Sequence, residues 1–234
     1  MTNKFNSWPS GKLPKEFQRP ELEQLKTLGY NWTDPRDAVV MFEKKVAEFA
    51  GSKFAVAVDC CTNGIFLTLQ YLKHRYNISG TIEIPKHTYQ SIPMHIKHCG
   101  FNVSFRDEQW SGMYQLKPYP VYDAATRWQQ GMYKNGFHVI SFQIKKRIPI
   151  GRGGMILFDD EAAYDWLSKA RYDGRDLSVS QWDDDGEICG WHMYMTPEDA
   201  ARGIILMDQV PTHTEDCGGW ENYADLSKKK LFKL

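Results

Sequence analysis

The chain has 234 residues, which is long enough for one large domain with a substantial core. Its 29 basic and 29 acidic side chains cancel, which argues against long-range attraction to nucleic acid or to an anionic membrane. No apolar run approaches the roughly 20 residues that span a bilayer, and the N-terminus lacks the apolar stretch of a secretory signal. Five cysteines without a CxxC pair favour a reduced, cytoplasmic protein over a disulfide framework or a structural zinc site.

Strand-like and helix-like segments alternate along most of the chain. Residues 1–37, rich in Pro, Asn and Lys, predict an N-terminal arm with one short helix. Strands are predicted at 54–58, 81–84, 101–105, 120–123, 138–142 and 155–158, and helices around 42–49, 65–72, 91–98, 161–172 and 196–207. This order predicts a three-layer α/β domain with a mostly parallel sheet flanked by helices, over residues 38–209. Residues 210–234 are polar and weakly patterned and predict a short C-terminal tail.

Three residues mark predicted helix ends. Gly51 follows the first helical pattern as a stop signal. Ser91 is a candidate N-cap for the 91–98 helix. Thr196, followed by Pro197 and two acidic residues, predicts the start of the last helix, because acidic side chains suit the positive end of the helix dipole.

Two adjacent lysines, Lys145 and Lys146, lie between the predicted strand 138–142 and a glycine-rich turn at 151–154. A lysine held there by a rigid sheet is placed to form an imine with an aldehyde cofactor. The alternative is an ordinary surface loop with solvated lysines, which this short segment on its own favours.

Three other features bear on the choice. The turn 60–64 joins a strand to a helix, where backbone N–H groups bind phosphate, and Thr62 adds a hydroxyl. Asp123 ends a strand and can pair with a cationic ring nitrogen, and Tyr89 can offer a ring face to a flat cofactor. Each has a structural alternative, namely an ordinary turn, a turn aspartate and a core tyrosine. Together with a lysine they are the parts that pyridoxal phosphate requires.

The order and spacing of these motifs resemble the DegT/DnrJ/StrS family of sugar aminotransferases, which are fold-type I pyridoxal-phosphate enzymes. The resemblance covers about residues 38 to 207. It is carried by the segments 46–51, 55–58, 60–64, 84–89, 122–125, 141–146, 151–155 and 190–196.

The resemblance implies a role for each candidate residue. Lys146, rather than Lys145, would form the Schiff base, and Asp123 would pair with the ring nitrogen. The other cofactor contacts would be Cys61, Thr62, Asn63 and Ser141 at the phosphate, Tyr89 and Thr126 against the ring, and His192 at the cofactor of a neighbouring subunit.

The chain departs from the family pattern in three ways. Cys60 and Cys61 stand where relatives carry Ser and Gly, which crowds the phosphate turn. His192 and Tyr194 replace Asn and Arg, and Tyr194 cannot replace a cation. The chain is also shorter than is usual in the family, so most of a smaller C-terminal domain is expected to be missing.

The resemblance implies a homodimer with shared active sites. It would transfer an amino group, by analogy from glutamate, to a nucleotide-linked keto sugar in surface polysaccharide or amino-sugar biosynthesis. Neither nucleic acid nor membrane is expected as a partner. Two alternatives stay open: a related enzyme or binder that holds the cofactor without this reaction, and a non-catalytic assembly partner of a complete enzyme. Lys146 argues against the dehydratase relatives, which carry His at that position.

Overall fold

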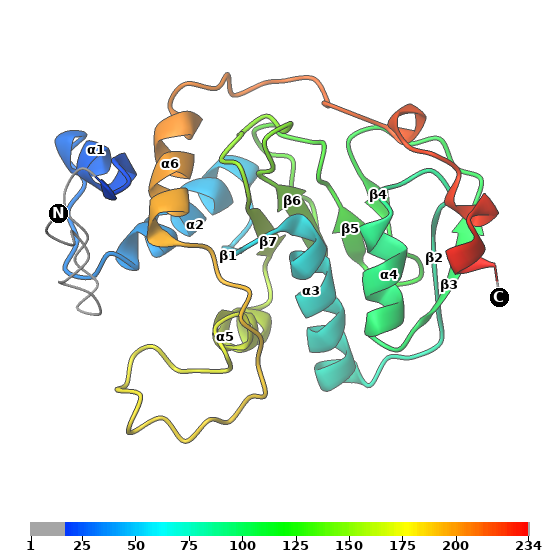
Figure 1. The fold of residues 1–234 in the computed structure, drawn as a ribbon, viewed down its shortest axis with the longest axis horizontal. Coiled ribbons are helices and arrows are strands. Elements are labelled where there is room, and N and C mark those ends of the chain that lie inside the picture. Colours follow the sequence, from blue (N-terminus) through cyan, green and yellow to red (C-terminus); the bar gives the residue numbers. More distant parts are fainter. Residues whose placement is uncertain (1–16, 234) are drawn as a thin grey trace, which may run out of the picture.

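A five-stranded mixed sheet lies between two layers of helices in the computed structural model, which describes residues 17–233 (Figure 1). The strand order is β1-β7-β6-β5-β4. The strands are β1 (Phe54–Val58), β4 (Tyr114–Gln115), β5 (Val121–Asp123), β6 (Phe137–Ser141) and β7 (Gly154–Phe158). Two further strands, β2 (Thr81–Pro85) and β3 (Asn102–Arg106), pair in parallel in a second sheet.

The sheet is less parallel than the alternation predicts. β5 and β6 are parallel, whereas β7 runs antiparallel to both of its neighbours, β1 and β6, and β4 runs antiparallel to β5. The connection from β6 to β7 explains why these two strands are antiparallel. A parallel pair needs a crossover, usually a helix, but residues 142–153 return from β6 to β7 without one.

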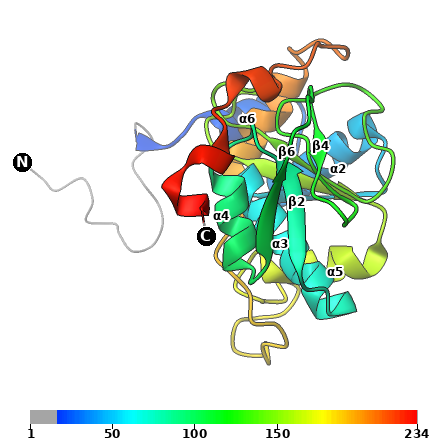
Figure 2. The ribbon, with the colours of Figure 1, turned by 90° about the vertical axis from the view of Figure 1, so that its right-hand side faces the viewer.

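Both faces of the sheet are buried, which confirms the three-layer architecture. The helices α3 (Cys61–Tyr76) and α5 (Glu161–Ala170) cover one face, and α4 (Ser91–His98) packs on α3 and on β3 of the second sheet. The helix α2 (Asp37–Ala50) covers the other face, α6 (Pro197–Met207) packs on α2, and α1 (Glu21–Thr27) packs on α6 (Figures 1 and 2). Alternate residues of β1 enter the two cores, with Val56 and Val58 in the first and Ala55 and Ala57 in the second.

Two of the three predicted helix ends are confirmed. Gly51 ends α2 at φ 84°, a conformation that favours glycine, and the Thr196 side chain accepts a hydrogen bond from Asp199 N at the start of α6. The prediction for Ser91 is wrong. Gln90 precedes α4 and already has helical dihedral angles, so Ser91 lies inside the helix, where its hydroxyl is 2.7 Å from that of Thr62.

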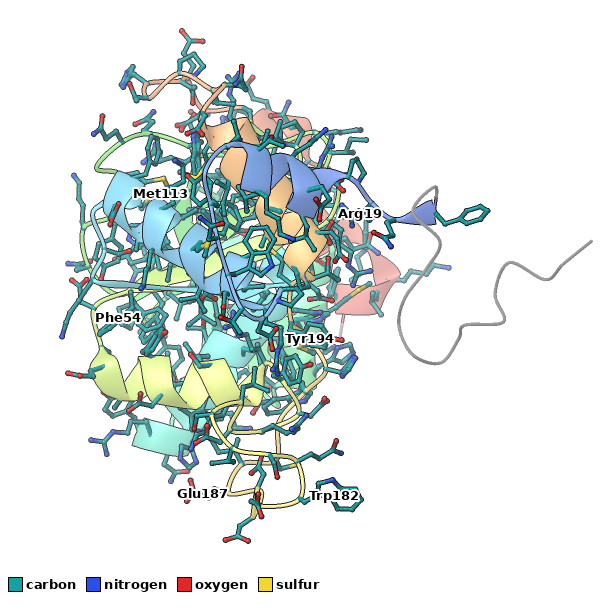
Figure 3. All side chains as sticks on the ribbon, turned by 90° about the vertical axis from the view of Figure 1, so that its left-hand side faces the viewer. Arg19, Phe54, Met113, Trp182, Glu187 and Tyr194 are labelled. Carbon is teal, nitrogen blue, oxygen red and sulfur yellow. The ribbon has the colours of Figure 1, made fainter. Side chains whose placement is uncertain are left out.

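The loop between α5 and α6 extends away from the body of the protein, with Trp182 and Glu187 at its outer end (Figure 3). Three short 3₁₀ turns follow α6, at Trp220–Asn222, Leu226–Lys228 and Lys230–Phe232. Within residues 17–233, no helix combines the length and apolar character needed to cross a membrane. All five cysteines are free thiols.

A buried ion pair joins the helices that flank β1 on opposite faces of the sheet. Glu43 of α2 pairs with Arg171, which follows α5. Both side chains also bond to the backbone of Ala57, whose N–H donates to Glu43 Oε1 over 2.7 Å and whose carbonyl accepts from Arg171 over 2.6 Å. The pair therefore fixes β1 to its flanking helices through one residue.

Arg171→Met is expected to lower the free energy of unfolding by about 3–5 kcal/mol, because it leaves the Glu43 carboxylate buried without its cation. Urea denaturation of the cofactor-free protein measures the change. The double variant Glu43→Gln/Arg171→Met should recover part of the loss, since it removes the unpaired charge. A loss below about 1 kcal/mol, as for an exposed pair, would contradict the expectation.

Candidate functional site

The loop that carries the two lysines is pinned to the core. Phe142, before the lysines in the chain, is fully buried, and its N–H donates to Gly153 O over 2.9 Å. Ile148, after the lysines, is also buried. As a result the two lysines differ: Lys145 is exposed, whereas Lys146 is half-buried. The segment is not a freely solvated loop.

Two glycines after this loop bring it against the start of α3. A Cβ on Gly153, which has φ 155°, would lie 2.8 Å from Met195 Cε, and a Cβ on Gly154 would lie 2.4 Å from Cys61 N. Ser141 pairs with Gly154 across β6 and β7. A side chain at residue 154 would clash with Cys61, so only glycine lets the strand approach α3 this closely. Ser141, opposite Gly154, therefore lies next to the first turn of α3.

Asp123 lies at the end of β5 and is almost completely buried. Its carboxylate accepts from the Tyr114 hydroxyl over 2.8 Å and from Ala125 N over 3.0 Å, and Cys61 Sγ lies 3.8 Å away. The Tyr114 hydroxyl is in turn within hydrogen-bond distance of Thr88 Oγ1. The carboxylate is thus held by groups from three different segments.

The electrostatics of this cluster favour a cationic ligand. Burial raises the pKa of the Asp123 carboxyl, while the hydrogen bonds from Tyr114 and Ala125 and the charge of Lys146 act in the opposite direction. Burial, with Asp123 nearby, raises the pKa of the Cys61 thiol well above its ordinary value, so the thiol stays neutral. On balance the pKa of the Asp123 carboxyl is raised, because burial is the largest effect. A buried carboxylate gains most from a further cationic partner.

The first turn of α3 has features that suit an anion. The helix is 16 residues long and has no acidic residue in its first turn. Cys60 precedes it in an extended conformation, and its Sγ accepts from Asn63 N over 3.4 Å. The Asn63 side chain donates to Asp59, and the Thr62 hydroxyl lies beside that of Ser91. Residues 61–64, predicted as a turn, are thus the first turn of the helix.

The two side chains expected against the cofactor ring contact the C-terminal segment. Tyr89 is 60 % exposed, and its ring centroid lies 6.5 Å from that of Tyr223. Thr126 is buried, and its hydroxyl donates to the carbonyl oxygens of Gly112 and Gly218 over 3.0 and 2.8 Å.

His192 lies in different surroundings. Its Nδ1 is 2.9 Å from Asp173 Oδ2, and its ring lies edge-on to Tyr194. It lines a cavity of about 260 Å³ together with Asp59 and Arg152, outside the cluster around Asp123. The structure therefore brings Asp123, Cys61 and Ser141 together, with the charge of Lys146 acting on Asp123, and places His192 at the separate cavity.

Among residues 17–233, no three His, Cys, Asp or Glu side chains are grouped so that they could hold a metal ion.

A profile of the DegT/DnrJ/EryC1/StrS aminotransferase family matches residues 16–128 and 125–216. The chain belongs to this family. That assignment agrees with the motifs found in the sequence.

Individual relatives resemble this chain in sequence or in fold. The chain is 25% identical to the spore coat polysaccharide biosynthesis protein SpsC of Bacillus subtilis, covering 94% of this chain and 69% of SpsC. It superposes on AtS13 of Actinomadura melliaura with a TM-score of 0.68 at 18% identity, and on the sugar aminotransferase CalS13 of Micromonospora echinospora with 0.66 at 17%. Each alignment covers 81% of this chain but only 64% of the solved structure.

Membership of this aminotransferase family implies pyridoxal phosphate, and the residues present fit it. A buried carboxylate suits a protonated ring nitrogen, a neighbouring lysine suits the aldehyde, and a helix start beside both suits the phosphate. Asp123 and the first turn of α3 are adjacent through the contact with Cys61, and the charge of Lys146 acts on the same carboxyl, so this set of residues fits the cofactor.

The local sequence patterns do not reveal the roles of Tyr114, which donates to Asp123 Oδ2, and of Thr88, whose hydroxyl contacts that of Tyr114. Tyr114 belongs to a two-residue strand, which is too short to show a period of two. No local pattern distinguishes this tyrosine from the others. Only the antiparallel pairing of β4 with β5, which sets Tyr114 opposite Asp123, identifies it.

Proposed function

We propose that the protein is a pyridoxal-phosphate-dependent aminotransferase that moves an amino group from glutamate to a nucleotide-linked keto sugar. The observation that carries the proposal is the buried carboxyl of Asp123, which Cys61 at the start of α3 contacts and on which the charge of Lys146 acts. The family assignment and the names of SpsC and CalS13 support a sugar as the acceptor. We further propose a cytoplasmic homodimer, in line with the free thiols and with the family resemblance.

The proposed roles follow from the chemistry of each side chain. When bound, the cofactor accepts the electron pair released at the donor's α-carbon. Lys146 holds the aldehyde carbon and, once displaced by the amino donor, moves a proton at that α-carbon as a general base and acid. Asp123 keeps the proton on the ring nitrogen. Tyr114 orients Asp123 and stabilises its ionised form through their hydrogen bond.

The remaining contacts are proposed from the family pattern. The first turn of α3, at Cys61, Thr62 and Asn63, binds the phosphate together with Ser141. Tyr89 and Thr126 contact the ring, and His192 reaches the cofactor of the other subunit.

The absorbance of the purified protein mixed with pyridoxal phosphate tests the proposal. We expect a visible band that borohydride bleaches, and loss of this band when L-glutamate is added, because amino transfer converts the cofactor to its amine form. D-glutamate is the control donor. A band that no amino donor alters would indicate a binder without this reaction. A protein that stays colourless with excess cofactor would indicate an assembly partner and would overturn the proposal.

A further inference from the structure

The C-terminal segment returns to the candidate site after α6. It runs from the end of that helix across the sheet to the side of β2, β3 and α4 (Figures 1 and 2). Residues 216–228 of this segment, called the strap below, lie on the chain segments that the family resemblance places around the cofactor ring. Three sets of contacts hold it there.

The first contact is at residues 126 and 127. Asp216 pairs with Arg127 over 2.8 Å and accepts from the Ser111 hydroxyl over 3.2 Å. The N–H of Cys217 donates to Thr126 O over 2.8 Å. The strap thus begins directly beside Thr126.

The second contact is at residues 110–112. The N–H of Trp220 donates to Trp110 O over 3.0 Å, and the N–H of Gly112 donates to Gly218 O over 3.0 Å. Gly112 has φ 72°, and a Cβ there would lie 2.2 Å from the Asp216 carboxylate. Close backbone approach therefore forms part of this contact.

The third contact is at residues 86 and 87. His87 Nδ1 lies 2.8 Å from Tyr223 O, and the N–H of Leu226 donates to Lys86 O over 2.8 Å. Leu226 is the one completely buried side chain between residues 208 and 233. Trp220 and Tyr223 pack against the core but are only partly buried. A segment with few completely buried side chains opens more readily than the core of a protein.

The strap occupies the groups that a cofactor ring would use. The Thr126 hydroxyl donates to Gly218 O. The Tyr223 ring stacks on Trp110, at 5.8 Å between centroids, and meets Tyr89 edge-on. Burial raises the pKa of the Tyr223 phenol to about 12, and the charge of Asp123 acts in the same direction. Thr126 and Tyr89 both contact the strap.

We propose that the strap is a lid on the candidate site, in which Tyr223 takes the space of the cofactor ring, so that the cofactor enters only when the strap moves away. The proposal rests on the proposed function, since it names pyridoxal phosphate as the ligand that the strap excludes. Binding to a fraction of open molecules slows loading in proportion to that fraction.

The test mixes cofactor-free, full-length protein with pyridoxal phosphate and follows the visible band by stopped flow. Tyr223→Ala empties the space and is expected to raise the loading rate by about tenfold or more. Tyr223→Phe keeps the ring and should load like the unaltered protein. Asp216→Asn weakens the first contact without altering the core and should also load faster. Tyr76→Ala, an exposed tyrosine at the end of α3, is the matched control.

Hydrogen exchange of residues 216–228 gives a second readout. We expect these amides to exchange faster in the unaltered protein once pyridoxal phosphate is bound. Equal loading rates in Tyr223→Ala and the unaltered protein, together with hydrogen exchange that cofactor binding leaves unchanged, would overturn the lid. Slower loading and weaker binding in Tyr223→Ala would also overturn it, because they would make the strap a fixed wall of the site. Absence of binding in every variant would instead overturn the proposed function together with the lid.

Discussion

Lys146→Ala is expected to abolish the pyridoxal-phosphate adduct that borohydride traps, and to lower the rate of amino transfer by about 10⁴-fold or more. The variant loses both the amine that holds the aldehyde carbon and the group that moves the proton. Lys146 is half-buried, and its charge acts on the Asp123 carboxyl. Peptide mass spectrometry after reduction locates the adduct.

Lys145→Ala is the matched control, because the two lysines are adjacent and Lys145 is exposed. It should keep the adduct and most of the activity. An adduct that survives in Lys146→Ala and disappears in Lys145→Ala would show that the lysine was assigned in the wrong register. Thermal denaturation of both cofactor-free variants checks that neither result comes from unfolding.

Asp123→Asn is expected to weaken pyridoxal-phosphate binding by about 2–5 kcal/mol, roughly 30-fold to a few thousand-fold in Kd, since it removes one partner of a buried charge pair. The amide is nearly the same size as the carboxylate and keeps one oxygen acceptor. Titration of the cofactor-free protein, followed by absorbance, measures the change. Binding within a factor of two of the unaltered protein would contradict the pairing of Asp123 with the ring nitrogen.

The same substitution should stabilise the cofactor-free protein at neutral pH. Burial raises the pKa of Asp123, so the folded state holds the proton more tightly than the unfolded state does. The stability that this protonation supplies is fully present below the pKa of an unfolded aspartate, and it is lost as pH rises through the folded-state pKa. The difference in melting temperature between Asp123→Asn and the unaltered protein should therefore grow with pH across the acidic range. Tyr114 and Ala125, which donate to the carboxylate, limit its size.

The layered fold and the chemistry of the candidate site were accessible from local patterns. Alternating strands and helices predict a sheet covered on both faces, and β1 shows this directly, with valines in one core and alanines in the other. The lysine, the strand-end aspartate and the strand–helix turn each belong to a motif of a few consecutive residues, so each can be recognised from the sequence. The direction of β7 was not accessible, because it depends on how the loop 142–153 packs.

The sequence by itself therefore determined the order of the elements and the residue types that suit a pyridoxal phosphate site. It also determined the helix ends at Gly51 and Thr196, because both depend on contacts within one helical turn. The tertiary structure alone decided which groups surround Asp123. Tyr114 meets it through pairing between strands, and Cys61 through the packing of α3 against the sheet. It also decided the surroundings of Thr126, whose hydroxyl bonds to Gly218, 92 positions further along the chain. Contacts at such separations depend on the packing of the whole chain, since the residues between them carry no periodic signal that fixes where the two ends meet.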